Sequence, residues 1–297
     1  MGEPARPDIR PLAWVTGAGG LIGNYVVQSA SARASRWRVW PLTRDQLDLT
    51  DFEAIQRLFD QEQPRLIIHC AAISKSPQCE ADPNTAWRIN VEVTQRLADL
   101  AKNIPFVFFS SDLVFDGKKG NYVESDSPNP LTVYGKTKAT AEETVLKNAK
   151  HTVIRTSLNY GASPTEDRAF NEELHRLWER GAAARLFTDE FRCPIPAEVT
   201  AQAAWELVHK QASGIYHLAG TERLSRLQIG QLIAARLPRL NSKIEAVSLR
   251  EYHGAPRSPD TSLDCSKVQP VLSFTLPSFS AWLTSQSCSR SASGDSQ

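Results

Sequence analysis

The sequence has little of what would mark a disulfide-rich, metal-bound or membrane-spanning protein. Its five cysteines among 297 residues include no CxxC pair, which argues against a disulfide framework and against a zinc site. No stretch approaches the roughly 18 consecutive apolar residues of a membrane helix. Residues 1–12 carry Glu3, Asp8 and several prolines where a secretory signal would have an apolar core. We therefore expect a soluble, cytoplasmic protein with no metal and no membrane partner.

A charge excess of either sign is also missing. The 34 basic and 33 acidic side chains give a net charge of +1, which leaves no electrostatic footprint for nucleic acid or an anionic membrane. Hydrophobic residues make up 41% and charged residues 23% of the chain, both ordinary for a globular protein. Composition therefore argues against nucleic-acid and membrane partners, and it does not indicate which reaction the protein catalyses.

The first half of the chain alternates short apolar runs with segments of helical periodicity. Unbroken apolar runs are typical of strands that are buried on both faces of a parallel sheet. Repeated strand–helix units predict a doubly wound parallel sheet, the Rossmann architecture. The strands are expected at 12–16, 38–42, 66–70, 106–109 and 151–155. The helices are expected at 24–34, 51–61, 83–102 and 134–147, the third of them with Trp87, Val91, Leu97 and Leu100 on its inner face.

After Gly161 the regular alternation of strands and helices ends. Helices are expected at 170–181, 199–211 and 227–237, a short strand at 214–219, and irregular chain at 184–196. We predict a dinucleotide-binding domain at 1–160 and a smaller, interleaved C-terminal α/β substrate-binding region at 161–284, part of which returns to the Rossmann sheet. The Ser-rich segment 285–297 is expected to be a disordered tail.

Glycines at 17, 20 and 23 lie between the first strand and the first helix. Gly17 permits a tight turn, Gly20 lets the backbone approach a pyrophosphate, and Gly23 lets helix and strand pack closely. Free N–H groups at the helix N-terminus favour phosphate binding. The motif, which includes Leu21 and Ile22, therefore predicts a dinucleotide site.

Arg44 follows the second strand, where an acidic residue would favour NAD. A guanidinium can bind a 2′-phosphate with two hydrogen bonds. The neighbouring Asp45 weakens the argument, and an ordinary surface arginine is the competing interpretation. We expect NADPH, with NADH as the alternative cofactor.

Tyr134 and Lys138 stand four residues apart, on one face of a predicted helix. A phenol with a pKa near 10 is a poor acid–base group at neutral pH, and a nearby ammonium group lowers that pKa. The pair alone is common in proteins. Ser111 adds weight, because it follows the fourth strand at the sheet edge where ligands of such folds bind. The three residues predict a catalytic set that polarises and protonates a carbonyl.

These motifs together resemble the extended short-chain dehydrogenases/reductases, and among them the dTDP-4-dehydrorhamnose reductase family. The resemblance runs from about Ala13 to Leu283. Its more specific segments are RTSLNYG at 155–161, TDEFRCPIPAEVTAQA at 188–203, GIYHLAG at 214–220 and SLDCSKV at 262–268.

The resemblance implies reduction of the C4 ketone of a nucleotide-linked 6-deoxy sugar. Tyr134 would donate the proton, Lys138 would bind the nicotinamide ribose, and Ser111 would polarise the ketone. Asp48 and Leu49 would lie near the adenine, and Ala71 and Ala72 under the cofactor. Ser74 would contact the sugar. These last assignments also have competing interpretations: Asp48 is a helix N-terminal residue, Ala71 and Ala72 are packing residues, and Ser74 is a solvated loop residue. A homodimer is the expected oligomer.

Two positions depart from the family pattern, since Leu113 and Leu158 stand where Tyr and Trp are usual. Both aromatic residues lie near the sugar in the family, so these changes bear on which sugar is bound and leave the hydride chemistry intact. The same motifs also resemble the regulatory β subunit of methionine adenosyltransferase, an NADP-binding partner protein. A regulatory role is therefore the alternative function.

Overall fold

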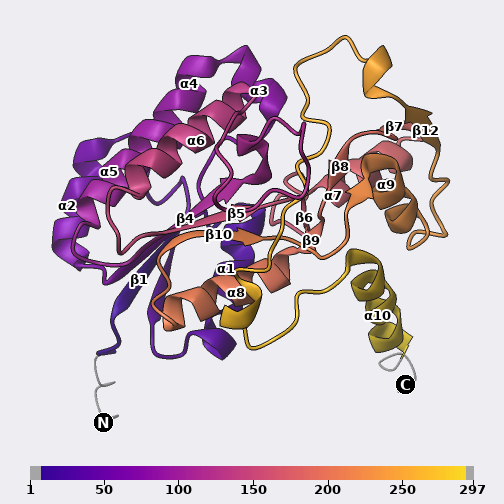
Figure 1. Cartoon of the computed structure of the whole chain (residues 1–297). Helices are drawn as coiled ribbons and strands as arrows, with labels where there is room; N and C mark the ends of the chain where they lie inside the picture. Colours follow the sequence, from indigo (N-terminus) through magenta and orange to yellow (C-terminus); the bar gives the residue numbers. More distant parts are fainter. Residues whose placement is uncertain (1–7, 292–297) are drawn as a thin grey trace.

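The computed structural model describes residues 8–291 of the chain. At its centre lies a parallel sheet of six strands in the order β10-β5-β4-β3-β1-β2. This arrangement confirms the predicted doubly wound sheet, and the strand that returns to it from the C-terminal part is β10 (Figure 1). The strands are β1 (Leu12–Thr16), β2 (Arg38–Leu42), β3 (Leu66–His69), β4 (Phe106–Ser111), β5 (Thr152–Thr156) and β10 (Gly214–Leu218).

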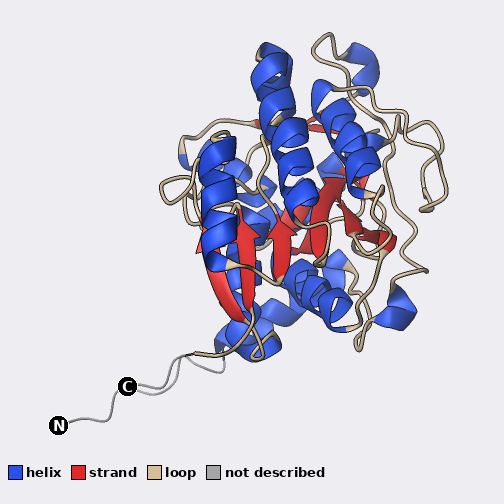
Figure 2. Ribbon diagram, turned by 90° about the vertical axis from the view of Figure 1, so that its left-hand side faces the viewer, coloured by secondary structure: helices blue, strands red, loops and turns tan. Residues whose placement is uncertain are grey.

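Helices cover both faces of this sheet, as Figure 2 shows. Side chains of α2, α5 and α6 form the core on one face, and side chains of α1 and α8 form it on the other. Strands β1, β3, β4 and β5 are buried along their whole length, as their apolar runs predicted. The helices are α1 (Leu21–Arg33), α2 (Phe52–Glu62), α3 (Ser76–Ala81), α4 (Pro83–Trp87), α5 (Val93–Leu100), α6 (Val133–Val145) and α8 (Ala197–His209).

The helix expected at 83–102 is interrupted by a π-helical turn, Arg88–Glu92. A π turn widens the helix and rotates the residues on its two sides relative to each other. Trp87, expected on the inner face, is therefore 44% exposed, whereas Val91 and Leu97 are buried as expected. The prediction for Trp87 was wrong because uninterrupted α-helical periodicity was assumed.

The smaller part of the molecule packs beside the carboxyl-terminal edge of the sheet (Figure 1). Residues 184–196, expected to be irregular, contain three short strands that pair with distant partners. The predicted disordered tail is helical as far as Ser291, and residues 292–297 lie outside the described part. Trp282 and Leu283 pack onto the apolar cluster of this region and so anchor that helix. The elements are β6 (Asn159–Tyr160), α7 (Phe170–Glu179), β7 (Ala184–Phe187), β8 (Phe191–Arg192), β9 (Ile195–Pro196), β11 (Leu224–Ser225), α9 (Arg226–Ala234), β12 (Ile244–Val247) and α10 (Phe279–Ser291).

Candidate active site

The candidate site lies at the carboxyl ends of four neighbouring parallel strands. β1, β3, β4 and β5 end at Thr16, His69, Ser111 and Thr156. In doubly wound sheets this edge is where ligands bind. The glycine-rich loop, Ala71, Ser111 and the loop after β5 are therefore brought to one side of the molecule.

The glycine-rich loop turns sharply between β1 and α1. Gly17 has φ +69°, a conformation that favours glycine, and a Cβ there would lie 2.6 Å from the backbone nitrogen of Ala71. Gly20 is the N-cap of α1, and the first turn of that helix carries no acidic side chain that would compete for its N–H groups. These features fit the phosphates of a dinucleotide, and they place Ala71 directly against the loop.

The end of β2 lies beside the same loop. The backbone N–H of Ala18 donates to the carbonyl oxygen of Leu42 over 3.3 Å, and Arg44 follows two residues later with an exposed side chain. Asp48 is also exposed and accepts hydrogen bonds from the backbone and hydroxyl of Thr50, which lower its pKa. Asp51, rather than Asp48, is the N-cap of α2, so the helix-terminal interpretation of Asp48 was wrong.

Leu49 and Ala72 are half-buried, and Leu49 packs at the border of the core formed with α2, α5 and α6. Leu21 is buried and Ile22 half-buried in the first turn of α1. Leu21 and Ile22 follow the glycine-rich loop directly. Leu49 and Ala72 lie after β2 and β3, the two strands that flank β1 in the sheet. Their predicted contacts with the cofactor stay predictions.

Tyr134 and Lys138 lie one turn apart on α6 and are both buried. The helix begins where the side chain of Thr132 accepts a hydrogen bond from the N–H of Gly135, 3.0 Å away. This start places Tyr134 in the first turn, beside the short 3₁₀ turn that follows β4. The Lys138 ammonium lies 3.9 Å from the ring centroid of Phe108 on β4. The structure thus brings Ser111, Tyr134 and Lys138 together at the end of one strand.

Burial dominates the titration of this pair. It raises the pKa of the Tyr134 phenol above its usual range; the interaction with the Ser111 side chain opposes the increase, and the charge of Asp112 adds to it. Burial also lowers the pKa of Lys138 to about 7, against the attraction of Glu142. From the sequence we expected Lys138 to lower the Tyr134 pKa. In the structure this pKa is raised, because desolvation of the phenolate is the largest effect. A phenol that stays protonated at neutral pH is suited to donating a proton.

Behind Lys138, a buried ion pair joins α6 to β5. Arg155 donates to the two carboxylate oxygens of Glu142 over distances of 2.7–3.1 Å, and both side chains are 2% exposed. Because Glu142 stands one turn after Lys138, the ion pair fixes the helix face that carries the catalytic set. No motif or spacing in the sequence singles out Glu142.

Asn90 is a further residue that the sequence reasoning missed. It lies in the π-helical turn, is 1% exposed, and its side-chain amide donates to Thr137 Oγ1 on α6 over 3.0 Å. The same side chain bonds both backbone groups of Ile73, in the loop after β3. Asn90 therefore ties that loop to the helix of Tyr134 and Lys138. A buried amide within an apolar helical stripe, as at this position, was the available signal.

Next to Ser111, charged side chains around Asp112 and Glu190 form a network. The Arg192 guanidinium lies 3.7 Å from Asp112 and 3.1 Å from Glu190. Glu190 also faces Arg226 at 3.9 Å and accepts a hydrogen bond from Arg257. Burial alone would raise the Glu190 pKa, but the three arginines outweigh it and hold the pKa below its usual range. Burial lowers the pKa of Arg226 to about 10.

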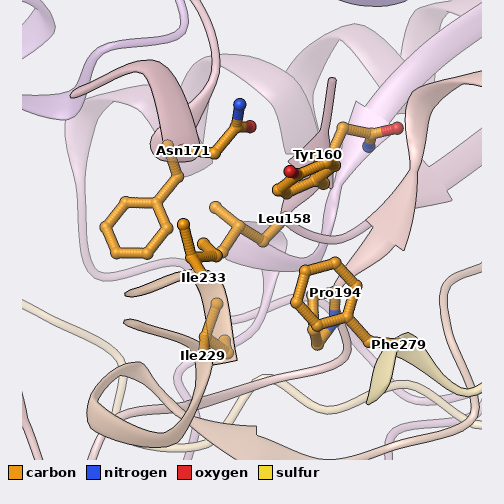
Figure 3. Close-up of a pocket in the computed structure, with 9 residues that line it drawn as sticks. Leu158, Tyr160, Asn171, Pro194, Ile229, Ile233 and Phe279 are labelled. Atoms are coloured by element: carbon orange, nitrogen blue, oxygen red, sulfur yellow. The ribbon is translucent and has the colours of Figure 1, made fainter. Parts of the chain in front are cut away.

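The other positions that bear on sugar binding, Ser74, Leu113 and Leu158, lie in three different surroundings. Ser74 is exposed in the loop between β3 and α3, and Leu113 packs in the small cluster that contains Tyr134. Leu158, where the family pattern has Trp, lines a small cavity together with Tyr160, Phe170 and Ile233 (Figure 3). This cavity belongs to the apolar core between α7, α9 and α10.

Two histidines near the site, His69 on β3 and His217 on β10, are buried and uncharged at neutral pH. Burial lowers the pKa of His69 to about 3 and that of His217 to about 4. His69 contacts the hydroxyls of Thr16 and Thr94 through its two ring nitrogens. Among residues 8–291, no group of three or more His, Cys, Asp or Glu side chains has a metal-binding arrangement, and no helix is long and apolar enough to cross a membrane.

Comparison with known proteins relates almost the whole described chain to one family. The model of the RmlD substrate binding domain family matches residues 13–287. Methionine adenosyltransferase 2 subunit beta of Rattus norvegicus is 30% identical over 86% of this chain and 81% of its own length. The probable low-salt glycan biosynthesis reductase Agl14 of Haloferax volcanii is 31% identical over 89% of this chain and 93% of its own. The solved dTDP-4-dehydrorhamnose reductase of Bacillus anthracis, in complex with NADP, superposes with a TM-score of 0.86 at 23% identity, covering 95% of this chain and all of that one.

Proposed function

Because the chain belongs to the RmlD substrate binding domain family, we propose that it reduces the C4 ketone of a dTDP-linked 6-deoxy sugar such as dTDP-4-dehydrorhamnose. The broader assignment is an NADPH-dependent oxidoreductase that acts on a nucleotide-linked sugar. A cytoplasmic location and a homodimer belong to the same proposal. The observation that carries it is the convergence of Ser111, Tyr134 and Lys138 at the edge of a dinucleotide-binding sheet.

The residues of the chain divide the reaction between them. Bound along the glycine-rich loop, NADPH supplies the hydride. Tyr134 holds the proton that the C4 oxygen receives, and its raised pKa keeps that proton in place until it is needed. Ser111 donates a hydrogen bond to the same oxygen and stabilises the charge that develops there. Lys138 is the proposed ligand of the nicotinamide ribose.

The charge network beyond Asp112 supports a nucleotide-linked substrate. Arg192, Arg226 and Arg257 gather around Glu190, Arg192 also faces Asp112, and the charge of Glu173 acts on Arg226. Arginine is the usual partner for phosphate groups because it is always charged and donates hydrogen bonds in pairs. This group of guanidinium side chains suits the diphosphate of a nucleotide sugar.

The regulatory role is the second candidate, and two observations favour it. A methionine adenosyltransferase subunit is 30% identical to this chain, as similar as the glycan biosynthesis reductase. Leu113 and Leu158 also replace aromatic residues of the reductase pattern. A binding subunit would retain the cofactor site and lack turnover.

Turnover with a defined substrate separates the two candidates. The purified chain is mixed with NADPH and dTDP-4-dehydro-6-deoxyhexose, loss of nicotinamide absorbance is followed, and the product is analysed by mass spectrometry for the gain of two hydrogens. The proposal predicts stoichiometric NADPH consumption and a reduced sugar. Normal NADPH binding without consumption would overturn it and support the regulatory role.

A further inference from the structure

Asp112 lies at the junction of the catalytic set and the substrate-binding half of the molecule. Its side chain is almost fully buried, and its Oδ1 accepts a hydrogen bond from Ser111 Oγ over 3.0 Å. Its Oδ2 accepts hydrogen bonds from Ser157 Oγ at 2.7 Å and Thr261 Oγ1 at 2.9 Å. With Arg192 at 3.7 Å, one carboxylate connects four segments that are far apart in the sequence.

The contact with Ser111 constrains that hydroxyl. A serine hydroxyl has a single hydrogen to donate, and in the structure Ser111 donates it to Asp112. The oxygen is also fixed from the other side, because it accepts a hydrogen bond from the N–H of Leu113 over 3.1 Å. Ser111 is therefore held by both of its neighbours and must turn its hydrogen from the carboxylate to a ketone when substrate binds.

Asp112 also acts on Tyr134 through its charge. The groups that act on the phenol are Cys79 from α3, Ser111 at the end of β4 and Asp112 directly after it. The negative charge of Asp112 adds to the rise in the pKa of Tyr134 that burial causes. The groups around Asp112 itself are Arg192 of β8 and the hydroxyls of Ser157 and Thr261.

We propose that Asp112 is a positioning residue for the reduction: its carboxylate holds the Ser111 hydroxyl in place beside Tyr134 and ties it to the substrate-binding half through Ser157, Thr261 and Arg192. This proposal rests on the proposed reductase function. Ser111 and Tyr134 touch the reacting oxygen, and Asp112 acts through them.

The kinetic test uses Asp112→Asn, which removes the charge and keeps an acceptor oxygen. We expect kcat to fall about 10²-fold, the loss typical of a misplaced catalytic group, with KM for NADPH unchanged. Without the negative charge the phenol loses its proton more readily, so the alkaline limb of the kcat profile moves to lower pH. A structural role alone would lower kcat at every pH. An unmoved limb or an unchanged kcat would overturn the proposal.

Asp116→Asn is the matched control. Asp116 belongs to the same loop and also accepts hydrogen bonds, from Tyr122 Oη at 2.7 Å and Asn129 Nδ2 at 2.9 Å, without touching the catalytic set. We expect this variant to keep the wild-type kcat and alkaline limb. The same shift in both variants would overturn a specific role for Asp112.

A stability cycle tests the contact without turnover. Urea unfolding is measured for wild type, Ser111→Ala, Asp112→Asn and the double variant. A direct hydrogen bond makes the two single effects non-additive, whereas additive effects would overturn the proposal. Absence of turnover in wild type would overturn the reductase function alone, because this cycle still decides whether Asp112 holds Ser111.

Thr261 provides a gentler pair of variants should Asp112→Asn fail to fold. Thr261→Val removes a hydroxyl that Asp112 Oδ2 accepts, and Thr261→Ser retains it. We expect kcat to fall several-fold in the valine variant and to return close to wild type in the serine variant. Equal kcat values in the two variants would overturn the proposal.

Discussion

The part of the molecule built on the six-stranded sheet and the smaller part beside it use buried charge differently. Under the proposed function they are the cofactor half and the substrate half. In the cofactor half, one ion pair between α6 and β5, Glu142 with Arg155, is sealed inside a regular sheet and helix frame. In the substrate half, Glu190 is shared by three arginines that come from short strands, a helix start and a loop. The first arrangement is balanced and rigid. The second gathers three arginines around one carboxylate, and under the proposed function these arginines bind an anionic substrate.

This difference follows from the elements that carry the charges. Regular strands and helices fix side chains at set spacings, so one acid and one base can be matched closely. Residues 184–196 and 248–262 are mostly short strands and loops, which meet only when the fold is complete. The comparison teaches that the part built on the six-stranded sheet provides a regular frame, and under the proposed function the other part provides the surface that recognises the substrate.

The largest expected effect is on the unfolding free energy when the Glu142–Arg155 ion pair of the cofactor half is broken. Glu142→Gln leaves the Arg155 guanidinium buried without its charged partner, and breaking a buried pair in this way costs about 3–5 kcal/mol of unfolding free energy. Urea unfolding measures it. Glu143→Gln, the adjacent and exposed position on the same helix, should stay within about 0.5 kcal/mol of wild type. A small loss in Glu142→Gln would mean that the cofactor half does not depend on this pair.

The next largest effect is on the unfolding free energy when Glu190, the carboxylate shared by three arginines, is replaced. Because the folded pKa of Glu190 is held below its unfolded value, its contribution to stability is present above about pH 4.3 and is lost as pH falls through the folded pKa. Glu190→Gln should therefore lower the unfolding free energy by about 2 kcal/mol at pH 7, as expected for lost charge-assisted hydrogen bonds.

Measuring unfolding from pH 7 to pH 3 checks both parts of this prediction. The variant should show a flatter pH dependence below pH 5 than wild type. Glu245→Gln, at an exposed ion pair of the same half, should reproduce the wild-type curve. Identical pH dependence in wild type and Glu190→Gln would contradict the role given to the arginines.

The smallest expected effect is on the affinity for NADPH relative to NADH. Arg44→Ala should weaken NADPH binding about tenfold, roughly 1.4 kcal/mol, and leave NADH binding nearly unchanged, because only NADPH carries the 2′-phosphate. Calorimetric titration with the two cofactors provides the comparison. Equal weakening would show that Arg44 does not distinguish them.

The sequence predicted the cofactor half well and the substrate half poorly, for physical reasons. Buried parallel strands and amphipathic helices have local periodicities, and the glycine loop and the Tyr134–Lys138 spacing are local as well. Asp112, Glu190 and Arg257 acquire their partners from residues up to 149 positions away, which no local pattern records. Asn90 was missed because its π-helical turn departs from the assumed period.

The proton-donating role of Tyr134 is the central claim, and one comparison tests it most directly. Wild type and Tyr134→Phe are saturated with NADPH, and the rate of reduction of dTDP-4-dehydro-6-deoxyhexose is measured at neutral pH. Removing an acid–base group should lower the rate by about 10²–10⁴-fold while NADPH binding stays intact. Equal rates in the two proteins would contradict the claim.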